Sequence, residues 1–405
     1  MKPIVRAERM KPVHSDIRGP LFVEAMKRQK QGIDILKLNT GNPATFGFGL
    51  PDSIKNALME HMQDGVGYCD FKGMPQARQA ICDYETSKGI KGITPDDVFI
   101  GNGVSEVVSF ALTPLLNDGD EVLVPSPSYS LWGNSVYLED RKPVFYTCDE
   151  QANWYPDIQD IRSKITDKTK AIVIINPNNP TGVLYPKEIL LEIIQVAREF
   201  GLLIFADEIY DRLVMDGKQH ISLASLTEDV PVITLNGLSK SHCLCGYRCG
   251  WMVISGPREL TEDYRQGIIQ LTSLRLCANT MAQIVIPAAL DDMETPASMV
   301  RPGGRIYEQR EATVRELEKI DGLSFVKNDA AFYVFPKLDV KKFNITNDKQ
   351  FAHDLLDATN ILLVPGSGFD WKDPDHFRIV MLPQADILSD AIRRMGTFLD
   401  GYKQK

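Results

Sequence analysis

Five short apolar segments in the middle of the chain each end in turn-forming or polar residues. They read "DEVLVPSPSY", "KAIVIINPNNPTG", "GLLIFADEIYD", "PVITLNGLSK" and "GWMVISGP". Apolar runs without polar alternation are typical of strands that are covered on both faces. The segment 186–200 between two of them spaces apolar residues on one predicted helical face: Ile189, Ile193, Val196 and Phe200. The middle of the chain therefore predicts an α/β fold, a mostly parallel sheet of about seven strands covered by helices.

The pattern changes after about residue 300. A charged helical segment, "GGRIYEQREATVRELEKI", precedes short strand pieces that alternate with helices. We expect a smaller α+β domain here, which the N-terminal residues join. The predicted division is an N-terminal arm and part of the small domain in 1–48, a large domain in 49–300, and the rest of the small domain in 301–405.

Charge and cysteine content narrow the class of protein. The chain has 45 basic and 54 acidic residues, a net charge of −9, without a Lys/Arg-rich run that would indicate nucleic-acid binding. It has neither a membrane-length apolar run nor an apolar signal-peptide core near its start. Its seven cysteines are odd in number, which favours reduced thiols and a cytoplasmic location.

Polar residues follow several of the predicted strands, where parallel sheets bind ligands. In "IGNGVSE", glycines precede a predicted helix whose free N–H groups suit a phosphate, with Ser105 in the first turn. In "NPNNPTG", Asn179 has a free amide, and in "FADEIYD", Asp207 is a poorly hydrated carboxylate with Tyr210 within reach. Each motif alone also fits a structural turn or an ordinary acid at a strand end.

Two cations lie in the stretch "GLSKSHCLCGYRCGW". A lone lysine such as Lys240 usually extends to solvent, but a shielded lysine near another cation has a lowered pKa and attacks carbonyl groups. Arg248, which stays protonated, requires an anion such as a phosphate.

Three cysteines raise the question of a metal site, and one further arginine raises the question of its anionic partner. The spacing of Cys243, Cys245 and Cys249 lacks the paired pattern of a zinc site, so we expect free thiols and no metal. Arg378 lies in the apolar strand "HFRIVMLP" and needs a carboxylate or phosphate, from a ligand or, as a structural ion pair, from the protein.

Together these motifs resemble the class I/II aminotransferases of the aspartate aminotransferase-like, fold type I, pyridoxal-phosphate family. The resemblance runs from "LKLNTGNP" to "FRIVMLP". Within the family, "DIRGP", "LNTGNPATFGF", "GYCDFKG", "LCAN" and "PGGRIYEQR" are similar to the bacterial glutamate–pyruvate (alanine) aminotransferase group.

The resemblance implies pyridoxal 5'-phosphate as cofactor and assigns roles around it. Lys240 forms an imine with the aldehyde, and Asp207 pairs with the pyridine nitrogen. The remaining cofactor contacts that it implies are phosphate binding by Gly103, Val104, Ser105 and Arg248, hydrogen bonds to the phenolic oxygen from Asn179 and Tyr210, ring stacking by Tyr129, and Ser239 beside the lysine. Many relatives have a serine where this chain has Gly237.

The resemblance also implies substrate and subunit contacts. Arg378, with Asn179 and Gly41, would bind the substrate α-carboxylate, and Arg18 is our candidate for the distal carboxylate of glutamate. Tyr68 would reach the phosphate of a neighbouring subunit, which implies a homodimer with shared sites.

The implied reaction is ping-pong transamination between L-alanine/pyruvate and 2-oxoglutarate/L-glutamate, with Lys240, Asp207 and Tyr210 as catalytic residues. Alternatives on the same fold are an aromatic, branched-chain or broad-specificity aminotransferase and a cysteine-sulfur β-lyase. A cofactor-binding regulator would need a DNA-binding module ahead of this fold. A nucleotide-binding oxidoreductase would need a third glycine that "GNGVSE" lacks.

Overall fold

The computed structural model describes residues 3–405, and its centre is an eight-stranded sheet in the order β2-β9-β8-β7-β6-β3-β4-β5. Strands β8, β7, β6, β3 and β4 are parallel to their neighbours among themselves, whereas β9 is antiparallel to both β8 and β2. This confirms the mostly parallel α/β sheet; the eighth strand is a two-residue edge strand, β5, antiparallel to β4. In spatial order the strands are β2 (Val98–Asn102), β9 (Cys249–Ser255), β8 (Val232–Gly237), β7 (Leu203–Asp207), β6 (Thr169–Ile175), β3 (Glu121–Ser126), β4 (Lys142–Asp149) and β5 (Tyr155–Pro156).

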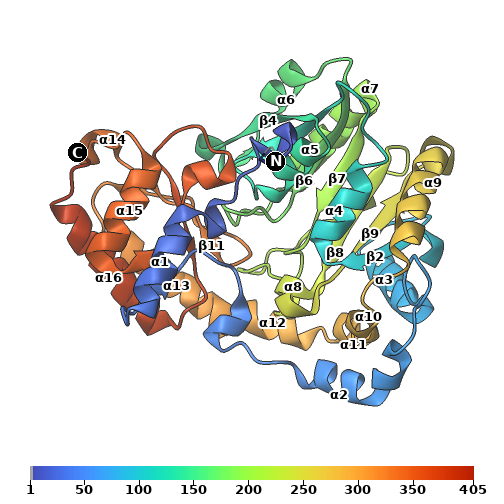
Figure 1. Ribbon diagram of the computed structural model, residues 1–405, viewed down its shortest axis with the longest axis horizontal. Helices are drawn as coiled ribbons and strands as arrows, with labels where there is room; N and C mark the ends of the chain where they lie inside the picture. The colour runs from blue at the N-terminus through green and yellow to red at the C-terminus, as the bar shows by residue number, and fades with distance from the viewer. Residues whose placement is uncertain (1–2) are drawn as a thin grey trace.

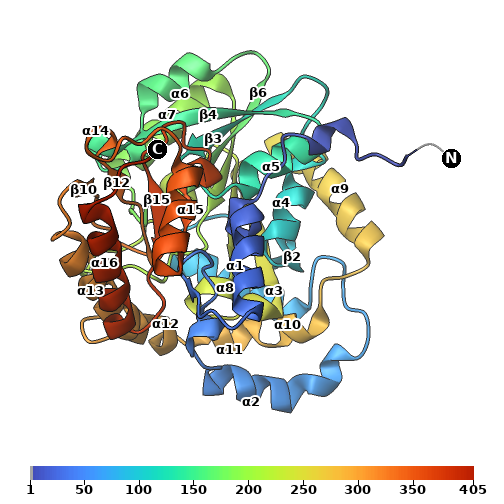
Figure 2. The same ribbon diagram turned by 60° about the vertical axis from the view of Figure 1, so that its left-hand side comes forward.

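Helices cover both faces of this sheet (Figures 1 and 2). Side chains alternate between the faces, as the two-residue period of a strand requires. In β6, Ala171 and Val173 pack with α4 (Val104–Leu112), α5 (Leu131–Leu138) and α9 (Arg258–Arg275), whereas Ile172 and Ile174 pack with α6 (Ile158–Lys164) and α7 (Lys187–Phe200). Helices α2 (Asp52–His61), α3 (Pro75–Ser87), α10 (Thr280–Ile284) and α11 (Ile286–Asp291) cover the β2 and β9 side.

The buried face of α7 differs in part from the sequence prediction. Ile193 and Val196 are buried as expected, but Phe200 is 46% exposed. The helix ends at Phe200, and Gly201 caps it in the left-handed conformation at φ 65°. The last residue of the helix therefore lies outside the buried face, which Leu190, Ile194 and Ala197 complete.

A smaller unit combines helix α1 (Pro20–Lys30) and strand β1 (Leu36–Lys37), shown in blue, with the C-terminal part of the chain, shown in orange and red (Figures 1 and 2). Strand β1 (Leu36–Lys37) pairs in parallel with β13 (Ile361–Leu362), and Leu38 shares a core with C-terminal residues. This packing supports the predicted small domain, whose boundaries near residues 48 and 300 stay a prediction. Its other main elements are β11 (Tyr333–Val334), β14 (Val364–Pro365), β15 (Phe377–Val380), α13 (Arg305–Leu317), α15 (Asp348–Thr359) and α16 (Ala385–Asp400).

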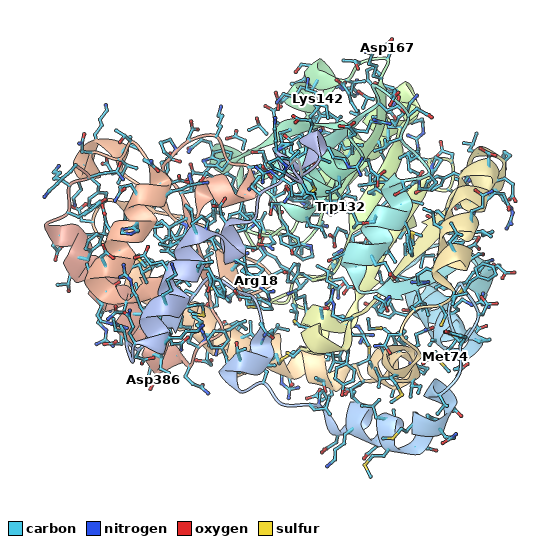
Figure 3. All side chains as sticks on the ribbon, viewed as in Figure 1. Arg18, Met74, Trp132, Lys142, Asp167 and Asp386 are labelled. Carbon is cyan, nitrogen blue, oxygen red and sulfur yellow. The ribbon has the colours of Figure 1, made fainter. Side chains whose placement is uncertain are left out.

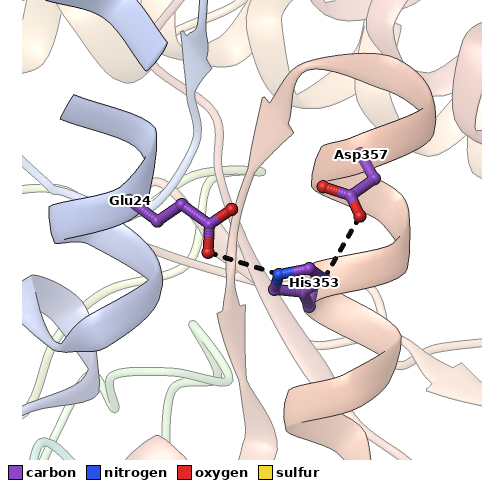
Figure 4. A group of neighbouring side chains, drawn as sticks. All are labelled: Glu24, His353 and Asp357. Carbon is purple, nitrogen blue, oxygen red and sulfur yellow. Dashed lines mark ion pairs between the residues drawn. The ribbon is translucent and has the colours of Figure 1, made fainter. Parts of the chain in front are cut away.

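Helix α1 (Pro20–Lys30) is attached to this unit by an ionic cluster (Figure 4). The His353 ring nitrogens lie 3.2 Å from a Glu24 oxygen and 3.3 Å from an Asp357 oxygen. The Arg28 guanidinium also contacts both carboxylates, so their charge is already balanced by side chains. The N-terminal segment before α1 therefore extends from a fixed point on the small unit.

Within residues 3–405, no single helix is long and apolar enough to span a membrane. One pair passes that test on length and composition alone, α9 with the segment Thr280–Asp291, but it is bent by 119°.

Candidate active site

The predicted polar residues gather at one edge of the central sheet. Asp207 is the last residue of β7, and its backbone accepts a 3.0 Å hydrogen bond from Asn176, where β6 ends. Lys240 lies in the short helix α8 (Leu238–Ser241), directly after β8. Adjacent parallel strands end together, so the loops that follow them converge, as the sequence predicted.

The Lys240 amine is partly buried and makes its hydrogen bond across the site. Its Nζ donates to the Gly41 carbonyl oxygen over 2.9 Å. Burial lowers the pKa of Lys240, whereas the ionisable groups of Tyr333 and Cys245 raise it, leaving it above its ordinary value. The expected fall is therefore absent from this structure. The cation that acts on Lys240 is Arg378, not the predicted Arg248.

Asp207 is buried, with 4% of its surface exposed. Its Oδ2 accepts a 3.0 Å hydrogen bond from the Trp132 indole, and Oδ1 accepts a longer one, 3.4 Å, from the Ile209 backbone. Burial raises the pKa of Asp207 to about 6, although the bond from Trp132 lowers it. A buried carboxylate of this kind favours a cationic partner, such as a protonated ring nitrogen.

Arg378 of β15 is almost fully buried at 1% exposure. It donates to Asn179 Oδ1 over 2.9 Å and to the Asn39 carbonyl, and its guanidinium carbon lies 4.6 Å from the ring centroids of Tyr333 and Phe369. Its Nε is buried without a hydrogen-bond partner, and within the described chain no carboxylate pairs with it. A structural ion pair, the alternative left open by the sequence, is thus not what holds this arginine, and an anionic ligand fits it.

Tyr210 contacts Tyr333, one of the two aromatic residues beside Arg378. Its hydroxyl is 2.9 Å from the Tyr333 hydroxyl, and both side chains are buried. A Cβ atom at Gly41 would lie 2.2 Å from that Tyr333 hydroxyl, so only glycine allows this approach. Tyr129 is partly buried and acts on the pKa values of both Lys240 and Arg378, which places it in the same cluster.

A second group of residues has the arrangement expected of an anion-binding cradle. Gly103 precedes α4 at φ +83°, and the first turn of the helix, with Val104 and Ser105, has no side-chain cap. A Cβ at Gly103 would lie 2.3 Å from the Arg248 guanidinium, so the arginine is packed on the glycine. Arg248 is exposed, and among the described residues its guanidinium donates one hydrogen bond, to the Cys245 carbonyl over 2.9 Å.

Cys245 joins this cradle to the lysine. Its Sγ lies 4.0 Å from Lys240 Nζ and 3.0 Å from the Ser239 carbonyl oxygen. Since the Cys245 carbonyl accepts from Arg248, this cysteine contacts both cations of the sequence motif.

Gly237 stands where many relatives have a serine. A Cβ atom at this position would lie 2.6 Å from the Cys249 carbonyl oxygen, which explains the glycine.

Sequence reasoning missed four residues that shape the site: Asn39, Trp132, Tyr333 and Phe369. Trp132 lies beside the central sheet, three residues after Tyr129 (Figure 3). The aromatic run "AFYVFP" was a signal for Tyr333. Within residues 3–405, the side chains of Tyr68 and Arg18 are exposed and make no hydrogen bond or ion pair to the cluster.

Comparisons with known proteins decide the family. The family description "Aminotransferase class I and II" matches residues 33–392. The chain belongs to the class I and II aminotransferases. It is 49% identical to the glutamate-pyruvate aminotransferase AlaA of Haemophilus influenzae, over 100% of both chains.

Solved structures agree with this family. An aminotransferase from Escherichia coli superposes with a TM-score of 0.98 at 46% identity, covering 100% of both chains. The alanine aminotransferase of Pyrococcus furiosus gives 0.93 at 40% identity, covering 98% of this chain and 100% of its own.

Members of this family depend in general on pyridoxal phosphate, and the residues of this aminotransferase fit that group. The cradle at Gly103 and Arg248 suits the phosphate, because Arg248 makes no ion pair within the described chain. The buried carboxyl of Asp207 suits a ring nitrogen. Lys240 is near enough to lower the pKa of Asp207, and Arg378 is near enough to lower the pKa of Lys240.

Proposed function

We propose that this aminotransferase interconverts L-alanine and 2-oxoglutarate with pyruvate and L-glutamate, using pyridoxal phosphate. One observation carries the proposal: Lys240 is linked to Arg248 through Cys245 and is affected by the charge of Arg378, and neither arginine has a carboxylate partner within residues 3–405. One arginine suits a phosphate and the other suits a substrate carboxylate. The names of the similar proteins support alanine and glutamate as substrates.

The cofactor contacts of this proposal divide between the two groups of residues. Lys240 binds the aldehyde covalently through its amine. The other contacts are the phosphate with Gly103, Val104, Ser105 and Arg248, the ring nitrogen with Asp207, the phenolic oxygen with Asn179 and Tyr210, and the ring face with Tyr129, with Ser239 next to the lysine. When bound, pyridoxal phosphate supplies an electron sink for the electrons left behind when the α-proton departs.

The protein's own residues supply the remaining steps. The Asp207 carboxylate keeps the ring nitrogen protonated, since the charged form of each stabilises the other. Lys240 would be the local base that removes the proton from Cα of the bound amino acid and delivers it to the cofactor carbon, and it would make the reverse transfer in the opposite half-reaction. Arg378 fixes the α-carboxylate with Asn179 and the backbone at Gly41, so that the bond to be broken is correctly oriented.

Tyr68 supports a homodimer with shared sites as part of the proposal. Its side chain is 84% exposed, and Val66, Leu274 and Leu276 are exposed apolar side chains as well. Exposed apolar residues of this kind are typical of a subunit interface. All seven cysteines, which lie within the described residues, are free thiols, which supports a cytoplasmic location.

An amino-acid panel tests the substrates. Purified enzyme with pyridoxal phosphate is supplied with single amino acids and either pyruvate or 2-oxoglutarate, and product oxo acids are measured. We expect L-alanine with 2-oxoglutarate and L-glutamate with pyruvate to give the highest kcat/KM. Higher values for aromatic or branched-chain amino acids, or pyruvate and sulfide released from cysteine without an oxo-acid acceptor, would contradict the proposal.

A further inference from the structure

His14 anchors the segment that precedes α1 through hydrogen bonds and ion pairs. Its backbone N–H donates to Asn134 Oδ1 over 3.1 Å, and its carbonyl accepts from Asn134 Nδ2 over 2.5 Å. Its ring Nε2 lies 3.0 Å from Asp370 Oδ1, and Nδ1 lies 3.5 Å from Asp16 Oδ2. One histidine thus joins a helix of the large sheet, α5, to residues of the small unit.

The partners of His14 are themselves held in place. The Asp370 carbonyl accepts from the Ser126 hydroxyl over 2.7 Å, at the end of β3. Asp16 pairs with Lys349 of α15 at 3.2 Å. The segment therefore crosses from one part of the molecule to the other between fixed groups.

The same segment touches the residues that hold Arg378. The Ile17 carbonyl accepts a 2.8 Å hydrogen bond from Asn39 Nδ2, and the Asn39 carbonyl accepts from Arg378. Phe369, whose ring lies against Arg378, directly precedes Asp370 in the chain. Arg18 follows Ile17 and lies just before α1, where the N-terminal segment passes between the two parts of the molecule (Figure 3).

We propose that protonated His14 is a positioning residue, which fastens residues 15–18 beside Arg378 so that Arg18 meets the distal carboxylate of a dicarboxylic substrate. The role rests on the proposed function, because it concerns the choice between glutamate and alanine. His14 touches neither substrate nor cofactor and acts through the segment that follows it.

The charged and titratable groups near the His14 ring belong to the N-terminal segment, to the small unit and to α5. Asp16 and Asp370 face its ring, Lys349 reaches it only through Asp16, and α5 contributes Tyr137, whose hydroxyl has a pKa raised by burial and by Asp370. The hydrogen bonds to Asp16 and then to Asp370 raise the pKa of His14 to about 9. In a released segment His14 would have its ordinary pKa of 6.5. The ion pairs of His14 therefore stabilise the bound segment fully below about pH 6.5, and this stabilisation is lost as pH rises through 9.

Two variants and a matched control test this role in the holoenzyme. His14→Gln and Asp370→Asn remove the charge pair but leave the backbone bonds to Asn134. His353→Gln is the control, because His353 also lies between two carboxylates, Glu24 of α1 and Asp357 of α15 (Figure 4). Half-reaction kcat/KM values are measured for L-glutamate and L-alanine between pH 6.5 and 9.5.

The glutamate-to-alanine ratio of kcat/KM is the decisive quantity, because the titration of Lys240 affects both substrates and cancels. We expect the wild-type ratio to fall about threefold across this pH range, as for a partly exposed ion pair. It should be low and independent of pH in His14→Gln and Asp370→Asn, and follow the wild type in His353→Gln. An unchanged wild-type pH profile in both variants would overturn the role of His14.

Amide hydrogen exchange separates this role from the proposed function. The Gly19 amide, which closes the turn of residues 16–18 by donating to the Asp16 carbonyl oxygen over 3.3 Å, should lose protection in the wild type as pH rises through 9, after correction for the intrinsic pH dependence of exchange, and at every pH in His14→Gln. Protein that transaminates neither substrate would contradict the proposed function, while the exchange data would still test the His14 contacts. Equal protection in the wild type and His14→Gln would refute the fastening itself.

Discussion

The indole N–H of Trp132 donates a 3.0 Å hydrogen bond to a carboxylate oxygen of Asp207 at the carboxyl end of β7. Both side chains are buried, and this bond opposes the effect of burial on the pKa of Asp207, which still rises to about 6. The ligand-free protein thus maintains an ionised carboxylate at neutral pH at a cost in stability, and a bound cation would remove that cost.

Asp207→Asn should therefore stabilise the ligand-free protein at neutral pH. The raised pKa means that the unfolded chain releases this proton more readily, so stability falls as pH rises from about 4 to about 6. The shift of roughly two units corresponds to about 3 kcal/mol at pH 7. Denaturant unfolding at pH 4.5 and 7 should show about 2 kcal/mol of this loss in the wild type and in the exposed control Asp386→Asn, but not in Asp207→Asn, whose transamination should fall by orders of magnitude. Equal pH dependence in Asp207→Asn and the wild type would contradict this account.

Lys240→Ala should abolish transamination and the visible absorbance of cofactor linked to the protein. Its amine is the only part of the side chain that the proposed chemistry uses, and alanine cannot replace it. Lys218→Ala is a suitable control, since Lys218 is an exposed lysine that pairs with Asp329 at 2.6 Å. Absorbance spectra and single-turnover assays provide the measurement, and normal turnover of Lys240→Ala would exclude the assignment.

Much of this site could be predicted because its chemistry follows buried strands. Asp207, Asn179 and Lys240 stand at strand ends whose apolar runs are plain in the sequence, and parallel strands bring such ends together. Trp132 and Tyr333 were not predicted, because their roles depend on hydrogen bonds across 75 and 123 residues of chain. A propensity for helix or strand contains no information about such pairs.

Where prediction failed, tertiary packing overrode the local pattern. Phe200 has the helical spacing of a core residue, but α7 ends there and leaves it exposed. Lys240 has a cation eight residues away in sequence, yet the cation that acts on its pKa is Arg378, brought in by β15. Periodicity locates the buried face of a helix, but it does not show at which residue that face ends.

Gly103→Ala should weaken cofactor binding without unfolding the enzyme. The new Cβ would lie 2.3 Å from the Arg248 guanidinium and impose φ +83° on an alanine. Strain of about 1–3 kcal/mol should displace the arginine from the cradle. Gly246→Ala is the control, because nothing lies within 4 Å of its added Cβ. Fluorescence titration of ligand-free protein with pyridoxal phosphate should show about a tenfold or larger loss of affinity in Gly103→Ala alone; equal affinities would contradict the cradle.

Arg378→Lys should impair both amino acids to the same extent. Lysine retains the charge but lacks the planar guanidinium that donates in fixed directions to Asn179 and the Asn39 carbonyl. Loss of a charge-assisted contact to the α-carboxylate should lower kcat/KM by about 10- to 100-fold for L-alanine and L-glutamate. Arg198→Lys, at an exposed forked pair with Asp229, should leave both values unchanged. A defect confined to glutamate would show that Arg378 binds the distal carboxylate instead.

Arg18→Ala should separate the two substrates. The Arg18 side chain is exposed and makes no hydrogen bond or ion pair within the described residues, so its removal disrupts no internal contact of the fold. If it binds the distal carboxylate, KM for glutamate and 2-oxoglutarate should rise about tenfold or more, while KM for alanine and pyruvate stays within about twofold. Arg9→Ala, an exposed arginine earlier in the same segment, is the matched control. Because alanine has no distal carboxylate, an equal rise for alanine and glutamate in Arg18→Ala would exclude selective recognition and leave Arg18 as a surface residue.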